Sequence, residues 1–144
     1  MVVPIHVAET AGRLRGIVGQ LHRRLRQVDN AGVLTPSQSA VLNRLDRDGP
    51  ATQAELAAGE HVRQQSMGAT LGVLDSLGLL RRSTDPADGR RIVIALSELG
   101  ERTVRGVNQH REEWLATALH STLSADELET IREALPLLQR LGQL

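Results

Sequence analysis

Apolar residues recur every three or four positions along most of the chain, which predicts a mainly helical protein. The first such stretch predicts a helix from about Val7 to Asp29, and Asp29, Asn30 and Gly32 are expected to end it. Further helices are expected at about 36–48, 53–59, 62–77, 98–119 and 125–141.

Several helix starts are marked by capping boxes, in which a Ser or Thr is followed three residues later by Gln or Glu. These boxes occur at Thr35 to Gln38, Thr52 to Glu55 and Ser124 to Glu127. The segment Asp48-Gly49-Pro50 ends the helix that the first box opens, because Gly and Pro both interrupt helices. The short helix opened at Thr52 is followed by another within about ten residues, which predicts a helix-turn-helix unit.

The helix after this turn has one apolar side and one side of small or hydrogen-bonding residues. At about 100° per residue, Met67, Leu71 and Leu74 fall on the apolar side. Small side chains at the middle and polar ones in the first turn suit a helix that enters the major groove of DNA. The residues of the second side and of the first turn are Arg63, Gln64, Gln65, Ser66, Ala69, Gly72 and Ser76.

Close packing against another helix is the alternative explanation for these small side chains. Gly68 and Gly72 lie inside the expected helix, where each costs about 1 kcal/mol relative to Ala. A close approach by a neighbouring group would compensate for that cost. The arginine-rich segment that follows favours the DNA interpretation.

Two short alternating runs, Leu79 to Thr84 and Arg91 to Leu96, predict a β-hairpin, because the second is rich in β-branched residues and Asp88-Gly89 lies in the connecting loop. The arginines of the hairpin suit contact with phosphates or insertion into a minor groove. They are Arg81, Arg82, Arg90 and Arg91. Asp85 and Asp88 are expected to cap the turn and to orient these arginines.

The first and last helices carry more apolar residues than they could bury against the rest of their own chain. The apolar residues of the last helix share one stripe, formed by Leu128, Ile131, Leu135, Leu138 and Leu141. We therefore expect residues 1–33 and 98–144 to form a dimerisation region, and residues 34–97 to form a winged helix-turn-helix region that binds DNA. A dimer also suits DNA half-sites spaced about one helical turn apart.

Composition is consistent with one helical fold unit and excludes several kinds of site. The chain has 144 residues, enough for one sizeable core, and Trp114 is its only aromatic residue. The absence of cysteine excludes disulfides, zinc-thiolate sites and thiol redox sensing. No apolar run has the length of a membrane span and the first residues do not resemble a secretion signal, so we expect a cytoplasmic protein without membrane contact.

Net charge is zero, from 17 basic and 17 acidic residues, which argues mildly against binding of nucleic acid. A duplex responds to the local patch that it contacts, however, so net charge decides little. Every one of the 17 basic residues is Arg, the side chain that forks onto phosphate or guanine. Coding by GC-rich DNA would give the same bias toward Arg.

An enzyme would need a convergent set of acids, bases or metal ligands. The five histidines are scattered singly, and Glu112-Glu113 is typical of a solvated helix face. We therefore expect no catalysis, no metal site and no cofactor. The remaining alternative to a DNA-binding regulator is a helical dimer that binds a protein partner without reading DNA, which the neutral charge and the bare helix face favour.

Three motifs resemble those of the MarR family of winged-helix transcription regulators. Leu74 to Arg82 resembles the family's Leu-Glu-x-x-Gly-Leu-Val-x-Arg, Asp85 to Arg90 resembles its wing, and Leu96 to Gly100 resembles its Leu-Thr-x-x-Gly. The resemblance extends over nearly the whole chain. It implies a homodimer that binds a palindromic operator in double-stranded DNA, usually represses transcription, and is often released by a small aromatic or phenolic effector.

The resemblance also places residues at the DNA interface. In the recognition helix it implies base contacts from Arg63, Gln64, Gln65, Ser66, Ala69 and Thr70. In the wing, DNA contact is expected from Arg82, Asp88, Arg90 and Arg91. For Arg90 the resemblance implies that it either touches DNA or braces the wing against Asp88. Contacts to the DNA backbone are expected from Thr52 and Gln53.

The chain departs from the family pattern at the wing and in the recognition helix. Gly89 stands where the family often has Arg or Lys, so Arg91 is a candidate to supply the charge at the wing tip. Gly68 and Ala69 stand where the family tends to have a hydroxyl residue and a longer polar one. Base reading is therefore expected to depend on Gln64, Gln65 and Ser66.

Overall fold

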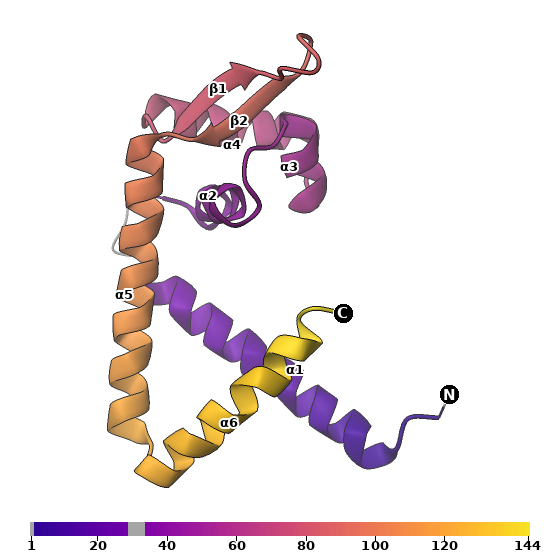
Figure 1. Cartoon of the computed structure of the whole chain (residues 1–144), viewed down its shortest axis with the longest axis vertical. Coiled ribbons are helices and arrows are strands. Elements are labelled where there is room, and N and C mark those ends of the chain that lie inside the picture. Colours follow the sequence, from indigo (N-terminus) through magenta and orange to yellow (C-terminus); the bar gives the residue numbers. More distant parts are fainter. Residues whose placement is uncertain (1, 29–33) are drawn as a thin grey trace.

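The computed structural model describes residues 2–28 and 34–144, so the helix-ending residues expected at 29, 30 and 32 lie outside the described part of the chain. The elements are α1 (Ile5–Val28), α2 (Pro36–Asp48), α3 (Gln53–Gly59), α4 (Gln64–Ser76), β1 (Leu80–Thr84), β2 (Ile92–Leu96), α5 (Glu98–Thr122) and α6 (Ala125–Leu141). Figure 1 shows α2, α3, α4 and the hairpin grouped at one end of the long helix α5. The helix α6 follows the other end of α5, and α1 leads away from the middle of α5. The predicted fold, helical with one β-hairpin, is confirmed.

All three predicted capping boxes are present, at Thr35, Thr52 and Ser124. In the first of them the Gln38 amide donates to the Thr35 hydroxyl at 3.3 Å, and the Gln38 side chain accepts from the Thr35 amide at 2.9 Å. Each box satisfies two backbone amides that the first helical turn leaves without partners. Local hydrogen bonding therefore fixes where α2, α3 and α6 begin.

The recognition helix α4 begins two residues later than predicted, at Gln64 instead of near Val62. His61 has a φ of 55°, in the left-handed region, and Arg63 is the extended N-cap residue with φ −69° and ψ 148°. These two conformations interrupt the helical path between α3 and α4, so the turn extends further than the apolar pattern indicated.

The core lies between α2, α3, α4 and the hairpin. Its most deeply buried side chains are Val41, Leu42, Leu56, Met67, Leu71, Leu74 and Ile94. In the antiparallel hairpin Leu80 pairs with Leu96 and Arg82 pairs with Ile94. Ala51 forms an isolated β-bridge to the hairpin, since its amide and carbonyl exchange hydrogen bonds with Ile94 at 3.0 and 2.8 Å. This one-residue bridge was not predicted, because a single pair leaves no alternation in the sequence.

Gly78 and Gly100 form the junction between α4, the hairpin and α5. Gly78 has a φ of 72°, which ends α4 in a conformation that favours glycine. The Ser97 amide donates to the Leu79 carbonyl at 3.0 Å, and its hydroxyl donates to the Gly78 carbonyl at 2.5 Å. A Cβ on Gly100 would lie 2.2 Å from the same Leu79 carbonyl oxygen. The start of α5 is thus held directly against the backbone of the winged region.

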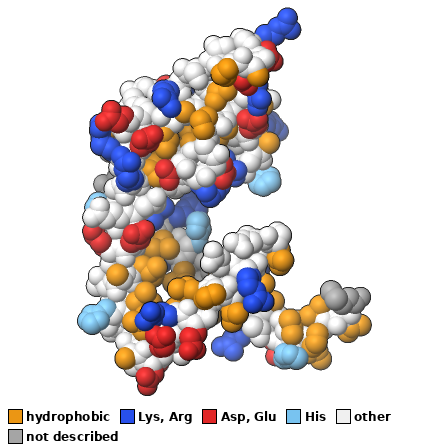
Figure 2. All heavy atoms as spheres, viewed as in Figure 1, with side chains coloured by type: hydrophobic (Ala, Val, Ile, Leu, Met, Phe, Trp, Pro, Cys, Tyr) orange, Lys and Arg blue, Asp and Glu red, His pale blue; other side chains and the backbone are white. Residues whose placement is uncertain are grey.

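Within the described chain, no residue of α1 or α6 is buried. Ile17, Val18 and Leu135 expose more than half of their surface, at 52%, 55% and 55%. Figure 2 shows hydrophobic side chains gathered over the part of the molecule that α1, α5 and the continuous helix α6 form. The apolar stripes of α1 and α6 are therefore open to solvent in the single chain. Among the described helices none is long and apolar enough to cross a membrane.

Substitution of Gly100 by Ala should destabilise the protein by about 2 to 3 kcal/mol, because the new Cβ would collide with backbone that cannot move freely. The matched control is Gly106→Ala on the same helix, where a Cβ would meet no atom within 4 Å. That control should be neutral or stabilising by up to about 1 kcal/mol. Urea unfolding followed by circular dichroism measures both, and equal stability of the two variants would contradict the close contact.

Candidate nucleic-acid interface

The recognition helix α4 buries one side and exposes the other, as predicted. Met67, Leu71 and Leu74 are at most 2% exposed. The exposed residues of the helix and its N-cap include Arg63, Gln64, Gln65, Ser66, Ala69, Gly72, Val73 and Ser76, while Thr70 is half-buried. The predicted base-reading residues therefore lie together along the first two turns of one helix, and all except Thr70 are open to solvent.

The first turn of α4 is tied to α3 through Gln53. The Gln53 side-chain amide donates to the Gln64 carbonyl at 2.9 Å. A Cβ on Gly68 would lie 3.0 Å from that amide nitrogen, whereas a Cβ on Gly72 would meet nothing within 4 Å. The close approach of the Gln53 side chain, from α3, thus explains why a glycine occupies position 68. Gly72, by contrast, leaves the outward face of α4 bare.

Thr52 and Gln53, expected at the DNA backbone, both have structural partners. The Thr52 hydroxyl accepts from the Glu55 amide at 3.2 Å and keeps its own proton for another acceptor. The Gln53 side chain is half-buried between α3 and α4 and holds them together. Thr52 caps α3 and Gln53 connects α3 to α4, so a phosphate contact by either residue would be additional to that structural role.

Two arginines of the hairpin are bound to carboxylates of the helices. Arg82 donates to Asp75 of α4 through Nε at 3.0 Å and Nη2 at 2.7 Å. Arg91 donates to Glu55 of α3 and lies 3.5 Å from Asp85. Arg91 is therefore at the base of the wing loop and does not supply charge at its tip. Both arginines, predicted as DNA contacts from their positive charge alone, fix the wing against α3 and α4.

The wing loop is shaped by its two aspartates. Asp85 accepts from the Ala87 amide at 2.9 Å, and Asp88 accepts from the Arg90 amide at 3.0 Å. The expectation that these aspartates cap the turn is confirmed, and Asp85 also orients Arg91. Asp88 holds the backbone of Arg90, so the guanidinium of Arg90 is left at the exposed tip of the wing.

Three arginines near α4 are exposed and have no ion-pair or hydrogen-bond partner for their guanidinium groups among residues 2–28 and 34–144. These are Arg63, Arg81 and Arg90. Arg81, on β1, is one of the four hairpin arginines that suit contact with phosphates, although it is not among the four wing residues at which DNA contact is expected. Its accessibility could not be read from the sequence, because Arg81 and Arg82 are adjacent and only the fold shows which one reaches Asp75.

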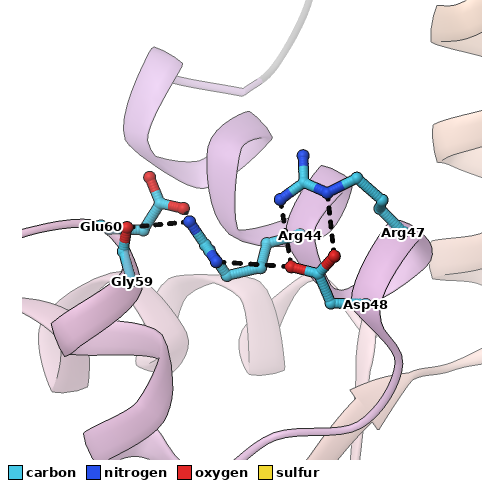
Figure 3. Close-up of polar contacts among 5 residues, drawn as sticks. All are labelled: Arg44, Arg47, Asp48, Gly59 and Glu60. Atoms are coloured by element: carbon cyan, nitrogen blue, oxygen red, sulfur yellow. Dashed lines mark hydrogen bonds and ion pairs between the residues drawn. The ribbon is translucent and has the colours of Figure 1, made fainter. Parts of the chain in front are cut away.

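Behind the interface, α2 is fastened to the end of α3 by Arg44, as Figure 3 shows. Arg44 donates to the Glu60 carboxylate at 2.6 Å and to the Gly59 carbonyl at 2.8 Å, and it also reaches Asp48 at 3.3 Å. Arg47 donates to the same Asp48 and thereby lowers the pKa of that carboxyl group. Sequence analysis missed this cluster, because nothing in a helical stripe marks a charged side chain that bridges two helices.

Glu55 takes part in both the α3 cap and the wing. Its carboxylate accepts from the Thr52 amide at 2.8 Å and from the guanidinium of Arg91. The hydrogen bond from the Thr52 backbone lowers the pKa of Glu55, and the positive charge of Arg91 acts in the same direction. One side chain therefore links the start of the helix-turn-helix to the base of the wing.

A cavity of about 340 Å³ lies on the side of the interface that faces α1 and α5. It is lined by residues of α1, α2 and α5 that include His22, Arg23, Arg26, Ser39, Asn43 and Arg111. Its walls thus come from both the expected dimerisation region and the expected DNA-binding region.

Comparison with known proteins gives consistent matches. A family model described as MarR family matches residues 34–91. The HTH-type transcriptional regulator Mb0904 of Mycobacterium bovis, itself uncharacterised, is 34% identical over 131 residues, covering 91% of each chain. A crystal structure from Pseudomonas aeruginosa PA01, assigned as a transcriptional regulator protein, has a TM-score of 0.84 at 38% identity over 99% of each chain. A mutant of S. aureus MepR, solved bound to an oligodeoxyribonucleotide, shares the fold with a TM-score of 0.66 at 24% identity, over 93% of this chain and 96% of that one.

Replacement of Glu55 by Gln should lower the free energy of unfolding at pH 7 by less than about 1 kcal/mol, since the group is exposed and Gln can still accept from Thr52. Because the folded-state pKa of Glu55 is depressed, its charge stabilises the fold above its ordinary pKa of 4.5 and loses this effect as pH falls below it. The difference in free energy of unfolding between wild type and Glu55→Gln should therefore decrease from pH 7 to pH 3. Urea unfolding at several pH values measures this, and a difference that grows toward acid pH would contradict it.

Proposed function

This chain belongs to the MarR family of transcriptional regulators, and we propose that it is a homodimeric repressor that binds a palindromic operator and is released by a small ligand. Residues 34–97 form the DNA-binding region of each subunit in this proposal, and residues 1–33 and 98–144 form the dimerisation region. Such a repressor acts on double-stranded DNA in the cytoplasm. The S. aureus MepR mutant, solved with DNA, provides a precedent on the same fold.

The observation that carries the proposal is the exposed face of α4 beside three arginines that have no partner within the described chain. Gln64, Gln65 and Ser66 present hydrogen-bonding side chains at the start of that face, where a helix in the major groove reaches base edges. Arg63, Arg81 and Arg90 flank the same helix or extend from the wing, where they can neutralise phosphates. These three arginines supply positive charge that no described carboxylate pairs with, although the net charge of the chain is zero.

The remaining predicted contacts take supporting roles. Ala69 and Thr70 continue the base-facing surface, and Thr52 and Gln53 approach the DNA backbone from the start of α3. Arg82, Asp88 and Arg91 hold the wing at the angle from which Arg90 enters the neighbouring groove or contacts its phosphates. Substitution of these residues should therefore weaken DNA binding mainly because the wing becomes less well positioned, and less because the protein loses positive charge at the DNA interface.

The exposed apolar residues of α1 and α6 support the proposed dimerisation. Leu135, Leu138 and Leu141 are 55%, 42% and 57% exposed and lie on one side of α6. Each Å² of such apolar surface that a second copy covers contributes roughly 25 cal/mol to association. We infer that α1 and α6 of two chains pack together and place two α4 helices on adjacent half-sites.

The cavity between α1, α2 and α5 is the proposed effector site. Its arginines and His22 suit an anionic group, and Leu34 and Pro36 in its wall suit an aromatic or phenolic ring. Binding there would release DNA if the ligand favours a separation of the two α4 helices that does not match the operator.

Arg90→Ala should weaken binding to all duplexes by a similar factor and reduce the slope of log affinity against log salt by about one per wing. Mobility shifts at two or more salt concentrations, on the DNA just upstream of the protein's own gene and on random duplex, measure this. The matched control is Arg132→Ala, which removes the same charge from α6, away from the wing. An unchanged salt slope in the Arg90 variant would contradict phosphate contact.

Gln65→Ala should change which base is preferred at one operator position and leave binding to random duplex nearly unchanged, because Gln65 contributes no charge. Selection from a random library with both proteins measures the preference. The same preference in both proteins would contradict base reading by Gln65. If wild-type protein shifts neither operator nor random DNA at low salt, the result would contradict DNA binding and favour the alternative, a helical dimer that binds a protein partner.

Leu135→Arg should convert the dimer to a monomer, since a charge would be buried at the centre of the α6 stripe. Glu133→Arg is the matched control, because Glu133 is also exposed on α6 but is outside the apolar stripe. Analytical ultracentrifugation gives the mass of each variant. A dimeric Leu135→Arg protein, or a monomeric wild type, would contradict this interface.

A further inference from the structure

The outward face of α4 changes in character along its length. Gln65, Ala69 and Val73 follow one another at intervals of four residues and therefore lie on one stripe. Gln65 offers hydrogen bonds at the start of the stripe, whereas Ala69 and Val73 offer only methyl groups. Val73 is 44% exposed and lies nearly opposite the buried Leu71 on the helix.

The polar side chains beside Val73 are already engaged. The Ser76 hydroxyl donates to the Val73 carbonyl at 2.7 Å, and the Thr70 hydroxyl donates to the Ser66 carbonyl at 3.2 Å. Gly72 adds no side chain, and a Cβ there would have no atom within 4 Å. Along the stripe after Gln65, the side chains of Ala69 and Val73 are therefore apolar, and Gly72 leaves the space beside them open.

We propose that Val73, with Ala69 one turn before it, reads the C5-methyl group of thymine in the operator. This inference rests on the proposed function, because it requires α4 to lie in a major groove. Among the groups that bases present in that groove, the thymine methyl is the apolar one. The isopropyl group of Val73 can bury that methyl group against itself, and no polar atom of the protein is left without a partner in doing so.

The same stripe thus reads A·T pairs in two ways. Gln65 suits the paired donor and acceptor of adenine, and Val73 and Ala69 suit the methyl group of thymine. Each buried methyl is expected to contribute about fourfold to affinity. A half-site selected by this helix should therefore contain thymines whose methyl groups, and not only their hydrogen-bonding edges, are required.

Replacement of thymine by deoxyuridine tests the inference, because it removes the methyl group and keeps base pairing. Duplexes are first selected from a random library with the full-length protein, and each thymine of the selected site is then replaced in turn. Wild-type protein should lose about fourfold in affinity at one or two thymines of each half-site. Val73→Ala should bind the thymine duplex more weakly and should lose most of that sensitivity at one of these positions.

The control variant is Val62→Ala. Val62 is equally exposed, at 44%, but lies in the turn before α4 and lines a cavity with Ser37 and Val41 of α2. It should keep the wild-type response to deoxyuridine at every position. Thermal unfolding by circular dichroism should show Val73→Ala folded, since the site is exposed and Ala favours helix.

Two results would overturn the inference while the proposed function stands. One is a selected site at which no deoxyuridine replacement weakens wild-type binding. The other is a Val73→Ala protein that keeps the full deoxyuridine penalty at every thymine. If the wild-type protein enriches no sequence at all, the proposed function fails first and the reading of thymine fails with it.

Discussion

The contact between the backbone of α5 and the carbonyl group of Leu79 joins the two halves of the molecule. The Leu79 oxygen accepts from the Ser97 amide, and Gly100 lies so close to it that no side chain fits between them. The Ser97 hydroxyl completes the junction through Gly78 and the Gly100 amide. Because α5 runs from here toward α1 and α6 (Figure 1), this junction sets the direction of the recognition helix relative to the proposed dimer helices.

The arginines around the recognition helix are divided between two tasks. Arg82 and Arg91 form ion pairs with carboxylates of α4 and α3 and so fix the wing. Arg63, Arg81 and Arg90 are exposed, and their guanidinium groups have no partner within residues 2–28 and 34–144. Exposed ion pairs contribute little stability, about 0 to 1 kcal/mol each. Their value here is geometric, because they orient the hairpin that carries Arg90. In the proposed function, a chain of zero net charge can therefore still present unpaired arginines to DNA.

Much of the fold could be predicted because its signals are local. Capping boxes place helix starts within a few residues, and the burial of Met67, Leu71 and Leu74 follows from helical spacing. The partners of the arginines could not be predicted in this way. Arg91 meets Glu55 across 36 residues of sequence, and Arg82 meets Asp75 of another element. Charge alone cannot distinguish an arginine that binds phosphate from one that braces a wing. The surroundings of the two glycines in α4 could not be predicted for the same reason, because they depend on which groups the fold brings near. Gln53 occupies the space beside Gly68, whereas a Cβ on Gly72 would meet no atom within 4 Å.

The position of the cavity gives a physical reason why a ligand could control DNA binding. Its walls come from α1, α2 and α5, so they belong to both regions that meet at the Leu79 junction. In the proposed dimer, a rotation of the winged region about that junction would change the shape of the cavity and the separation of the two recognition helices together. A ligand shifts such an equilibrium only by its difference in affinity between the two arrangements. A molecule that fits the cavity at one separation therefore selects that separation, and an operator with fixed half-site spacing then favours or rejects the liganded dimer.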